Sequence, residues 1–84
     1  MGRKISTVRG VVERVIGPKE TKTGSWFVQL IVKGQTYGFF GEEAEAEVIA
    51  RDAPAGREIT IGWYPNGNYR NIDHVEARYD RTTA

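Results

Sequence analysis

The fold is decided by a stretch toward the C-terminal end of the 84-residue chain, which contains REITIGWY at residues 57–64, PNGN at 65–68 and YRNIDHVEARY at 69–79. In the first segment Ile59, Ile61 and Trp63 alternate with smaller or polar residues, which is the spacing of a strand with one buried face. Pro and Asn-Gly in the second segment favour chain reversal. We therefore predict a β-hairpin with its turn at residues 65–68.

The second strand of this predicted hairpin carries Tyr69, Ile72 and Val75. The three-residue step from Ile72 to Val75 breaks strict alternation, so we predict a β-bulge near Asp73 or His74. Neighbouring residues of a strand point to opposite faces, and for this reason Asp73 and His74 are not expected to form a catalytic dyad.

The composition of the chain is typical of a small all-β domain. Ile and Val together number 15 against one Leu, and seven Thr accompany them. The chain has no Cys and one His, which excludes disulfides, thiolate zinc sites and thiol catalysis. No phosphate-loop or metal-ligand spacing is present, so we predict a protein that is not an enzyme and needs no cofactor or metal. No long apolar span or signal peptide is found, and we expect a single soluble, cytoplasmic domain over residues 1–84 without a membrane partner, with flexible ends at 1–4 and 80–84.

The net charge of +1 hides a polarised distribution along the chain. Residues 1–41 hold seven basic and two acidic residues (+5), residues 42–58 hold six acidic and two basic residues (−4), and residues 59–84 hold three of each. Such a domain can hold a polyanion on one side and repel it from the other. The alternative is that an ordinary charge content is segregated by element without a functional consequence.

The N-terminal half predicts three strands. The first covers Ile5–Ile16 and contains Gly10, which allows a sharp bend, and a polar loop follows at Gly17–Gly24. Alternation is clearest in the second strand, Ser25–Lys33, and a two-residue Gly34-Gln35 turn leads to the third strand, Thr36–Gly41.

Pairing of Lys33 with Thr36 would place Val32 opposite Tyr37, and Leu30 opposite Phe39, on a core face. The other face would carry Phe27, Gln29, Gly38 and Phe40, with Lys33 at its rim. Gly38, in mid-strand, leaves room for a ligand to approach the backbone. We predict a ligand platform on this face; a register shifted by one residue, or Phe40 packed on the helix, is the alternative.

A single helix is predicted at Glu42–Arg51, with Ala44, Val48 and Ile49 as its apolar side. Its glutamates suit the N-terminal end of the helix dipole, and Arg51 suits the C-terminal end. We expect this helix to close the bottom of a barrel. Metal capture is not expected, because the glutamates fan out around the helix.

The whole pattern resembles the OB-fold, in particular small single-stranded DNA-binding domains of this fold. The resemblance covers nearly the whole chain and is carried by Val8-x-Gly10-x-Val12, Ser25-Trp-Phe-Val-Gln-Leu, Gly34-x-x-Tyr-Gly-Phe-Phe-Gly41 and the run from Tyr69 to Ile72. It implies an all-β, five-stranded Greek-key barrel with one α-helix between strands 3 and 4, and oligonucleotide binding over strands 2 and 3 and the loops beside them.

The resemblance also implies a function and a set of residues for it. Single-stranded DNA, with RNA possible, would be bound with little sequence preference by stacking of bases on exposed aromatic rings and by Lys and Arg contacts to phosphate. The residues that meet the ligand in this fold correspond to Lys19, Lys22, Phe27, Gln29, Phe40, Tyr64, Tyr69 and Arg70. The local mixture of amide, aromatic and cationic groups in the hairpin, which includes Asn71, and the platform described above add Lys33, Asn66 and Asn68.

Two further expectations concern the tryptophans and the assembly state. Trp63 alternates with Ile59 and Ile61 and should be partly buried, so Tyr64 is the better candidate for stacking. A homo-oligomer is possible, and an alternative function is a protein-interaction or assembly module built on a small barrel. The sequence leaves open whether the chain serves replication, repair or a viral process.

Overall fold

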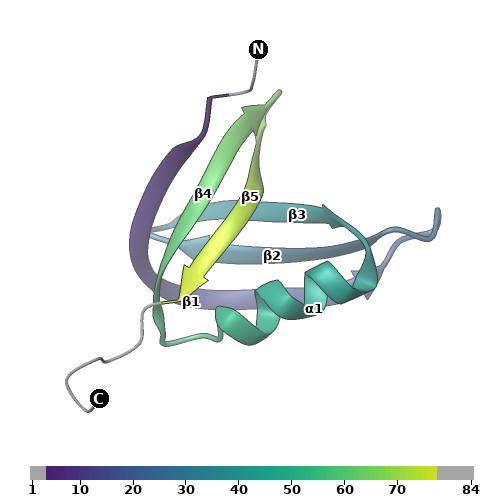
Figure 1. Ribbon diagram of the computed structural model, residues 1–84, viewed down its shortest axis with the longest axis horizontal. Coiled ribbons are helices and arrows are strands. Elements are labelled where there is room, and N and C mark those ends of the chain that lie inside the picture. Colours follow the sequence, from purple (N-terminus) through teal and green to yellow (C-terminus); the bar gives the residue numbers. More distant parts are fainter. Residues whose placement is uncertain (1–3, 78–84) are drawn as a thin grey trace.

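The computed structural model describes residues 4–77 of the chain. Five strands and one helix follow one another in the order drawn in Figure 1. Their bounds are β1 Ser6–Glu20, β2 Trp26–Val32, β3 Gln35–Gly41, α1 Glu43–Asp52, β4 Glu58–Asn66 and β5 Tyr69–Ala77.

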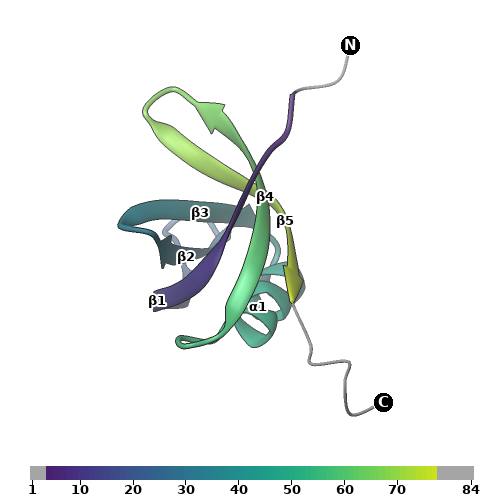
Figure 2. The ribbon, with the colours of Figure 1, turned by 90° about the vertical axis from the view of Figure 1, so that its left-hand side faces the viewer.

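The strands close into a barrel with the order β1-β2-β3-β5-β4, in which β4 pairs again with β1. All neighbours are antiparallel except β3 and β5, which meet in parallel at Gly38 and Asn71. Helix α1 lies at one end of the barrel, and the β4–β5 hairpin rises from the other end (Figure 1, Figure 2). The predicted class, an all-β, OB-like five-stranded barrel with one helix between β3 and β4, is confirmed.

Strand β1 pairs with two neighbouring strands because it is long and bends. Its first part, residues 6–11, pairs with β4, and its second part, residues 12–20, pairs with β2. At the bend a Cβ on Gly10 would lie 2.9 Å from Val32 Cγ1, so a side chain has no room there. The predicted role of Gly10 as the bending residue agrees with this packing.

The loop predicted at Gly17–Gly24 is wrong over its first four residues. Residues 17–20 belong to β1, where Lys19 pairs with Phe27 after an irregularity in the ladder. Gly17 has φ 92°, and a Cβ on it would lie 2.7 Å from the carbonyl oxygen of Phe27. A Gly-Pro pair usually indicates a loop, but here the irregularity absorbs it and the pairing continues to Glu20. The loop itself spans only residues 21–25.

The β2–β3 hairpin differs from prediction in its register but not in its faces. The turn is formed by Lys33 and Gly34, with φ 53° and 75°, and Val32 pairs with Gln35. Each residue of β2 therefore pairs two positions earlier on β3 than predicted. A shift of one residue exchanges the two faces of a strand, whereas a shift of two restores them. The predicted core face and platform face are therefore both retained.

The predicted apolar side of helix α1 is right at Ile49 and wrong at Ala44 and Val48. Ala46, Ile49 and Ala53 are buried, whereas Ala44 and Val48 are exposed. Ala46 and Ile49 are three residues apart and share one helical face, and Ala53 follows four residues later as the C-cap of the helix. Small alanines at two of these positions let the helix lie close to the strands, and α1 contacts β1, β2, β3 and β5.

The β4–β5 hairpin has a shorter turn than predicted. Asn66 pairs with Tyr69, so Gly67 and Asn68 form the turn and Pro65 and Asn66 belong to β4. The predicted bulge is confirmed: Gly62 pairs with His74 and Trp63 with Ile72, which leaves Asp73 as the extra residue.

The core fills the inside of the barrel. Val12, Val28, Leu30, Val32, Ile59 and Ile61 are the largest side chains that are fully buried. Tyr37 and Ile72 are nearly as well covered, and Trp63 is half-buried, as predicted. Within residues 4–77, no helix has the length and hydropathy to cross a membrane. Of the predicted flexible ends at 1–4 and 80–84, residues 1–3 and 80–84 lie outside the described residues.

Candidate functional site

The platform face of β2 and β3 and the facing side of the β4–β5 hairpin enclose two adjoining hollows. One is lined by Phe27, Gln29, Phe40, Asn66 and Tyr69, together with Thr21 and Asn71. The other shares Gln29, Phe40, Tyr69 and Asn71 with the first and adds Thr36, Gly38, Asn68 and Arg70. Because they share four residues, we treat the two hollows as one surface and call these eleven residues the groove.

Three aromatic rings of the groove are available to a ligand. Phe27 and Phe40 are paired across β2 and β3, with ring centroids 5.8 Å apart and ring planes inclined by 30°. Phe40 is 61% exposed and Tyr69 is 72% exposed. Exposed rings gathered in one place make this surface a candidate for binding. The alternative in which Phe40 packs on the helix is thereby excluded.

A lateral row of residues crosses the middle of the groove. Gln29 pairs with Gly38, Gly38 with Asn71, and Asn71 with Tyr64, so the row runs through β2, β3, β5 and β4. Asn71 Nδ2 donates a hydrogen bond to Tyr64 Oη at 3.5 Å. The row therefore sets two amide side chains on either side of a residue that has no side chain.

Thr21 and Thr36 line the groove but were absent from the predicted site, whereas Asn71 was named only within the hairpin's mixture of amide, aromatic and cationic groups. The face on which Asn71 lies could be predicted from the sequence, because it is two residues after Tyr69 and therefore shares its face of β5. Its position beside Gly38 could not, since that depends on the parallel β3–β5 pairing. Thr21 and Thr36 carry no local signal that separates them from other surface threonines.

Arg70 is the single Lys or Arg that lines the groove. Its guanidinium carbon lies 6.0 Å from the ring centroid of Tyr37 and 5.9 Å from that of Trp63. Those two rings pack edge to face, with centroids 5.7 Å apart. Cation–π contacts at this distance hold the arginine over the top of the core. The groove lining carries one positive charge and no acidic side chain, and its other polar groups are amides and hydroxyls.

The predicted lysines lie outside the groove lining. Lys19 is exposed and pairs with Phe27 across β1 and β2, so it is next to the aromatic end. Lys22 is exposed in the nearby 21–25 loop. Lys33 lies in the β2–β3 turn, six residues along β2 from Phe27, or roughly 20 Å at the rise of a strand. The Lys33 side chain lies near Gly10. It is therefore not at the rim of the Phe27–Phe40 pair, where the predicted platform placed it.

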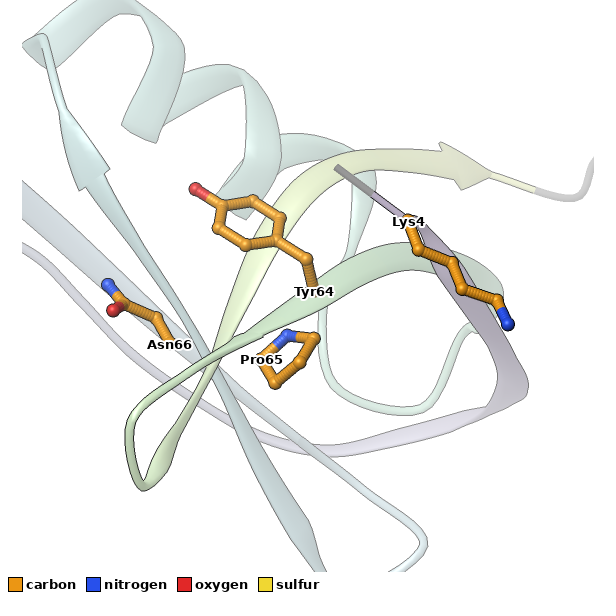
Figure 3. Close-up of a pocket in the computed structure, with 4 residues that line it drawn as sticks. All are labelled: Lys4, Tyr64, Pro65 and Asn66. Atoms are coloured by element: carbon orange, nitrogen blue, oxygen red, sulfur yellow. The ribbon is translucent and has the colours of Figure 1, made fainter. Parts of the chain in front are cut away.

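Tyr64 lines a separate hollow with Lys4, Pro65 and Asn66, which Figure 3 shows. Its hydroxyl points away from the Lys4 ammonium in that view and is the acceptor for Asn71. Asn66 lines both this hollow and the groove, so the two surfaces are contiguous. Tyr64 is half-buried, which makes Phe40 and Tyr69 better placed than Tyr64 for stacking.

Asp73 and His74 do interact, contrary to prediction. Asp73 Oδ2 lies 2.9 Å from His74 Nδ1, and Glu76 Oε2 lies 3.5 Å from His74 Nε2. The bulge at Asp73 interrupts the alternation of faces, which is why neighbouring side chains meet. His74 and Asp73 line a hollow between α1 and β5. Across the described part of the chain, no group of three or more His, Cys, Asp or Glu residues is arranged to hold a metal.

Comparisons of the chain with family models, with curated proteins and with solved structures give no match. Function is therefore inferred from the barrel and from the chemistry of the groove.

Proposed function

We propose that this protein binds single-stranded nucleic acid in the groove, with DNA as the expected ligand and RNA as a possible one, in the manner of small OB-fold single-strand binders. The observation that carries the proposal is the exposure of Phe40 and Tyr69 beside Phe27 in one open surface lined by amides. Aromatic faces suit unpaired bases, because every base has a π face and stacking is tolerant of sequence.

The arrangement of rings and cations suggests how the ligand would lie. Bases would stack on Phe40 and Tyr69, and each stack would contribute about 1–3 kcal/mol. Lys19 and Lys22, at the Phe27 end, and Arg70, at the hairpin, would contact phosphates at either side of the stacked bases. Most of the affinity would then come from bases, because the lining of the groove holds only one cation.

A duplex would be a poor ligand for such a surface. Its bases are stacked on one another and paired, so their faces are not available to protein rings, and only its phosphates could be contacted. The groove offers those phosphates a single lining arginine. Binding is inferred to be the function, and no catalytic step is proposed.

The test is a titration of the full chain with labelled single-stranded and duplex DNA of the same length at two salt concentrations. The expected result is saturable binding of the single strand, weak binding of the duplex, and a shallow salt dependence for the single strand. Each phosphate contact on a single strand contributes about −0.7 to the slope of log K against log salt concentration. Equal affinity for both DNAs, or none for either, contradicts the proposal. The same single strand made of RNA decides between the two nucleic acids.

A second candidate is assembly through the same surface, because exposed rings such as Phe40 and Tyr69 also serve protein contacts. Size-exclusion chromatography with and without the oligonucleotide separates the two. A dimer that is lost in Phe40→Ala, with no nucleic-acid affinity in the parent, favours assembly. A monomer that binds the single strand favours nucleic acid.

A further inference from the structure

Gly38, in the middle of the groove, is a glycine that the backbone geometry and packing of the barrel do not require. The structure describes nine glycines. Five have positive φ: Gly17, Gly24, Gly34, Gly56 and Gly67. At three others, Gly10, Gly41 and Gly62, a Cβ would lie within 3.0 Å of a neighbouring side chain. Gly38 is the ninth and has neither property. A Cβ there would have one neighbour within 4 Å, Gln29 Cγ at 3.8 Å, which is ordinary contact.

A glycine inside a strand weakens it, because it loses more conformational freedom on folding and has no side chain to pack. At Gly38 neither a positive φ nor a close contact requires glycine. The missing side chain leaves a gap in β3 at the point where Gln29 and Asn71 lie on the two neighbouring strands. Two strand spacings separate the backbones of these residues by roughly 9–10 Å.

The two amides beside the gap are suited to a hydrogen-bonding ligand. Gln29 is half-buried and, within residues 4–77, its amide has no hydrogen-bond partner. The Asn71 amide is oriented by its contact with Tyr64 Oη. A side-chain amide has both a donor and an acceptor, as has the edge of a nucleobase. The ring of Phe40, two residues along β3 from Gly38, is on the same face and is exposed.

We propose that the space over Gly38 is a base slot, in which one unpaired base lies flat on the Gly38 backbone and is recognised at its edges by the amides of Gln29 and Asn71. This inference rests on the proposed function and makes it more specific. The stacking positions accept any base, whereas the slot is the position at which the identity of the base matters. A good amide–base pair changes affinity by at least about fivefold between the right and the wrong base.

The test compares the parent protein with Gly38→Ala in titrations with labelled single strands of about 12 nucleotides, a length within the range of one OB fold, made of deoxythymidine, deoxycytidine or deoxyadenosine. The parent is expected to bind these strands with affinities that differ by at least about fivefold. In Gly38→Ala the methyl group occupies the slot, so the affinity for the preferred strand is expected to fall by at least about fivefold and the three affinities to converge. The thermal midpoint should be unchanged or higher, since alanine removes the glycine penalty and meets no close contact.

A matched control adds carbon to a strand outside the groove. Val11 is 52% exposed on β1 and pairs with Glu58, so Val11→Ile should bind all three strands as the parent does. Gln29→Ala is a second test that leaves the backbone of β3 unchanged, and it should reduce the difference between the three strands more than it reduces their mean affinity.

The outcomes separate the slot from the proposed function. Parent-like affinity and selectivity in both Gly38→Ala and Gln29→Ala overturn the slot while leaving single-strand binding in place. Absence of binding by the parent overturns the proposed function and the slot together. Loss of selectivity in Gln29→Ala supports the slot even if Gly38→Ala does not fold.

Discussion

The two faces of the β2–β3 ribbon are both rich in apolar residues, but the rest of the molecule covers only one of them. On the inner face Val28, Leu30 and Val32 are fully buried and Tyr37 is 4% exposed. On the outer face Phe27 and Phe40 form a ring pair, and Phe40 stays 61% exposed. The same two strands thus carry side chains that hold the barrel together and side chains that the barrel leaves uncovered.

The difference shows that an apolar side chain in this small barrel is buried only where another element covers its face. The inner face is closed by β1, β4, β5 and α1, and its residues contribute to folding. The outer face is approached by the β4–β5 hairpin, which contributes Tyr69 and Asn71 to the groove, and by Thr21 of the 21–25 loop. We therefore expect substitutions on the inner face to change stability and substitutions on the outer face to change binding.

The largest effect is expected in the core. Ile61 is fully buried, so Ile61→Ala should lower the free energy of unfolding by about 2–5 kcal/mol, through lost apolar contact and the cavity that remains. Urea unfolding followed by tryptophan fluorescence measures it. Val48→Ala, at a 43% exposed helix position, is the control and should change the free energy by no more than about 0.5 kcal/mol. Similar effects of both would remove the distinction between covered and uncovered apolar residues.

The next effect is expected on the outer face. Phe40→Ala should weaken binding of a single-stranded oligonucleotide by about 1–3 kcal/mol. It should lower stability by at most about 1.5 kcal/mol, the upper value for an aromatic pair such as Phe27–Phe40. Fluorescence anisotropy and urea unfolding of the same variant give both values. A stability loss as large as that of Ile61→Ala would show that Phe40 belongs to the core.

A smaller effect is expected at Arg70, which is shared by the two faces because it lines the groove and lies over Tyr37 and Trp63. Arg70→Ala should lower the free energy of unfolding by about 0.5–1 kcal/mol through loss of the cation–π contacts, and should shift the emission of Trp63. Arg14→Ala, at an exposed position of β1, is the matched control. Unchanged stability and emission in Arg70→Ala would limit this arginine to the groove.

The smallest effect on binding is expected from substitution of single lysines. The salt dependence of binding in these variants shows which end of β2 the phosphates of the ligand contact. Lys22 is in the loop beside the Phe27 end, so Lys22→Ala should reduce the slope of log K against log salt concentration by about 0.7, the contribution of one phosphate contact. Lys33 is at the far end of β2, and Lys33→Ala should leave the slope unchanged. The reverse result would place the ligand along the β2–β3 turn and contradict the proposed phosphate contact of Lys22.

Much of the groove could be predicted from local patterns. Alternation in β2 places Phe27 and Gln29 on one face, and alternation in β3 places Gly38 and Phe40 on one face. These assignments survived an error of two residues in the register, because the period of a strand is two. The position of Lys33 did not survive it, because a residue that moves from a strand into a turn leaves the face altogether.

The remaining features depend on contacts between distant segments. The continuation of β1 through Gly17 to Glu20 requires β2 as a partner, and the buried side of α1 is chosen by the strands it covers. The meeting of Asp73 and His74 depends on how β5 pairs with β4. None of these three features can be predicted from the residue types of one segment.

By itself, the sequence determined the strand-rich class, the order of five strands and one helix, the faces of β2 and β3, and the bulge at Asp73, since these follow from periodicity and turn chemistry within short windows. Only the tertiary structure decided that Gly38 lies between Gln29 and Asn71, and that Arg70 lies over Tyr37 and Trp63. The physical reason is that barrel closure brings β3 and β5 together in parallel across some thirty residues of chain, and no local preference encodes that register.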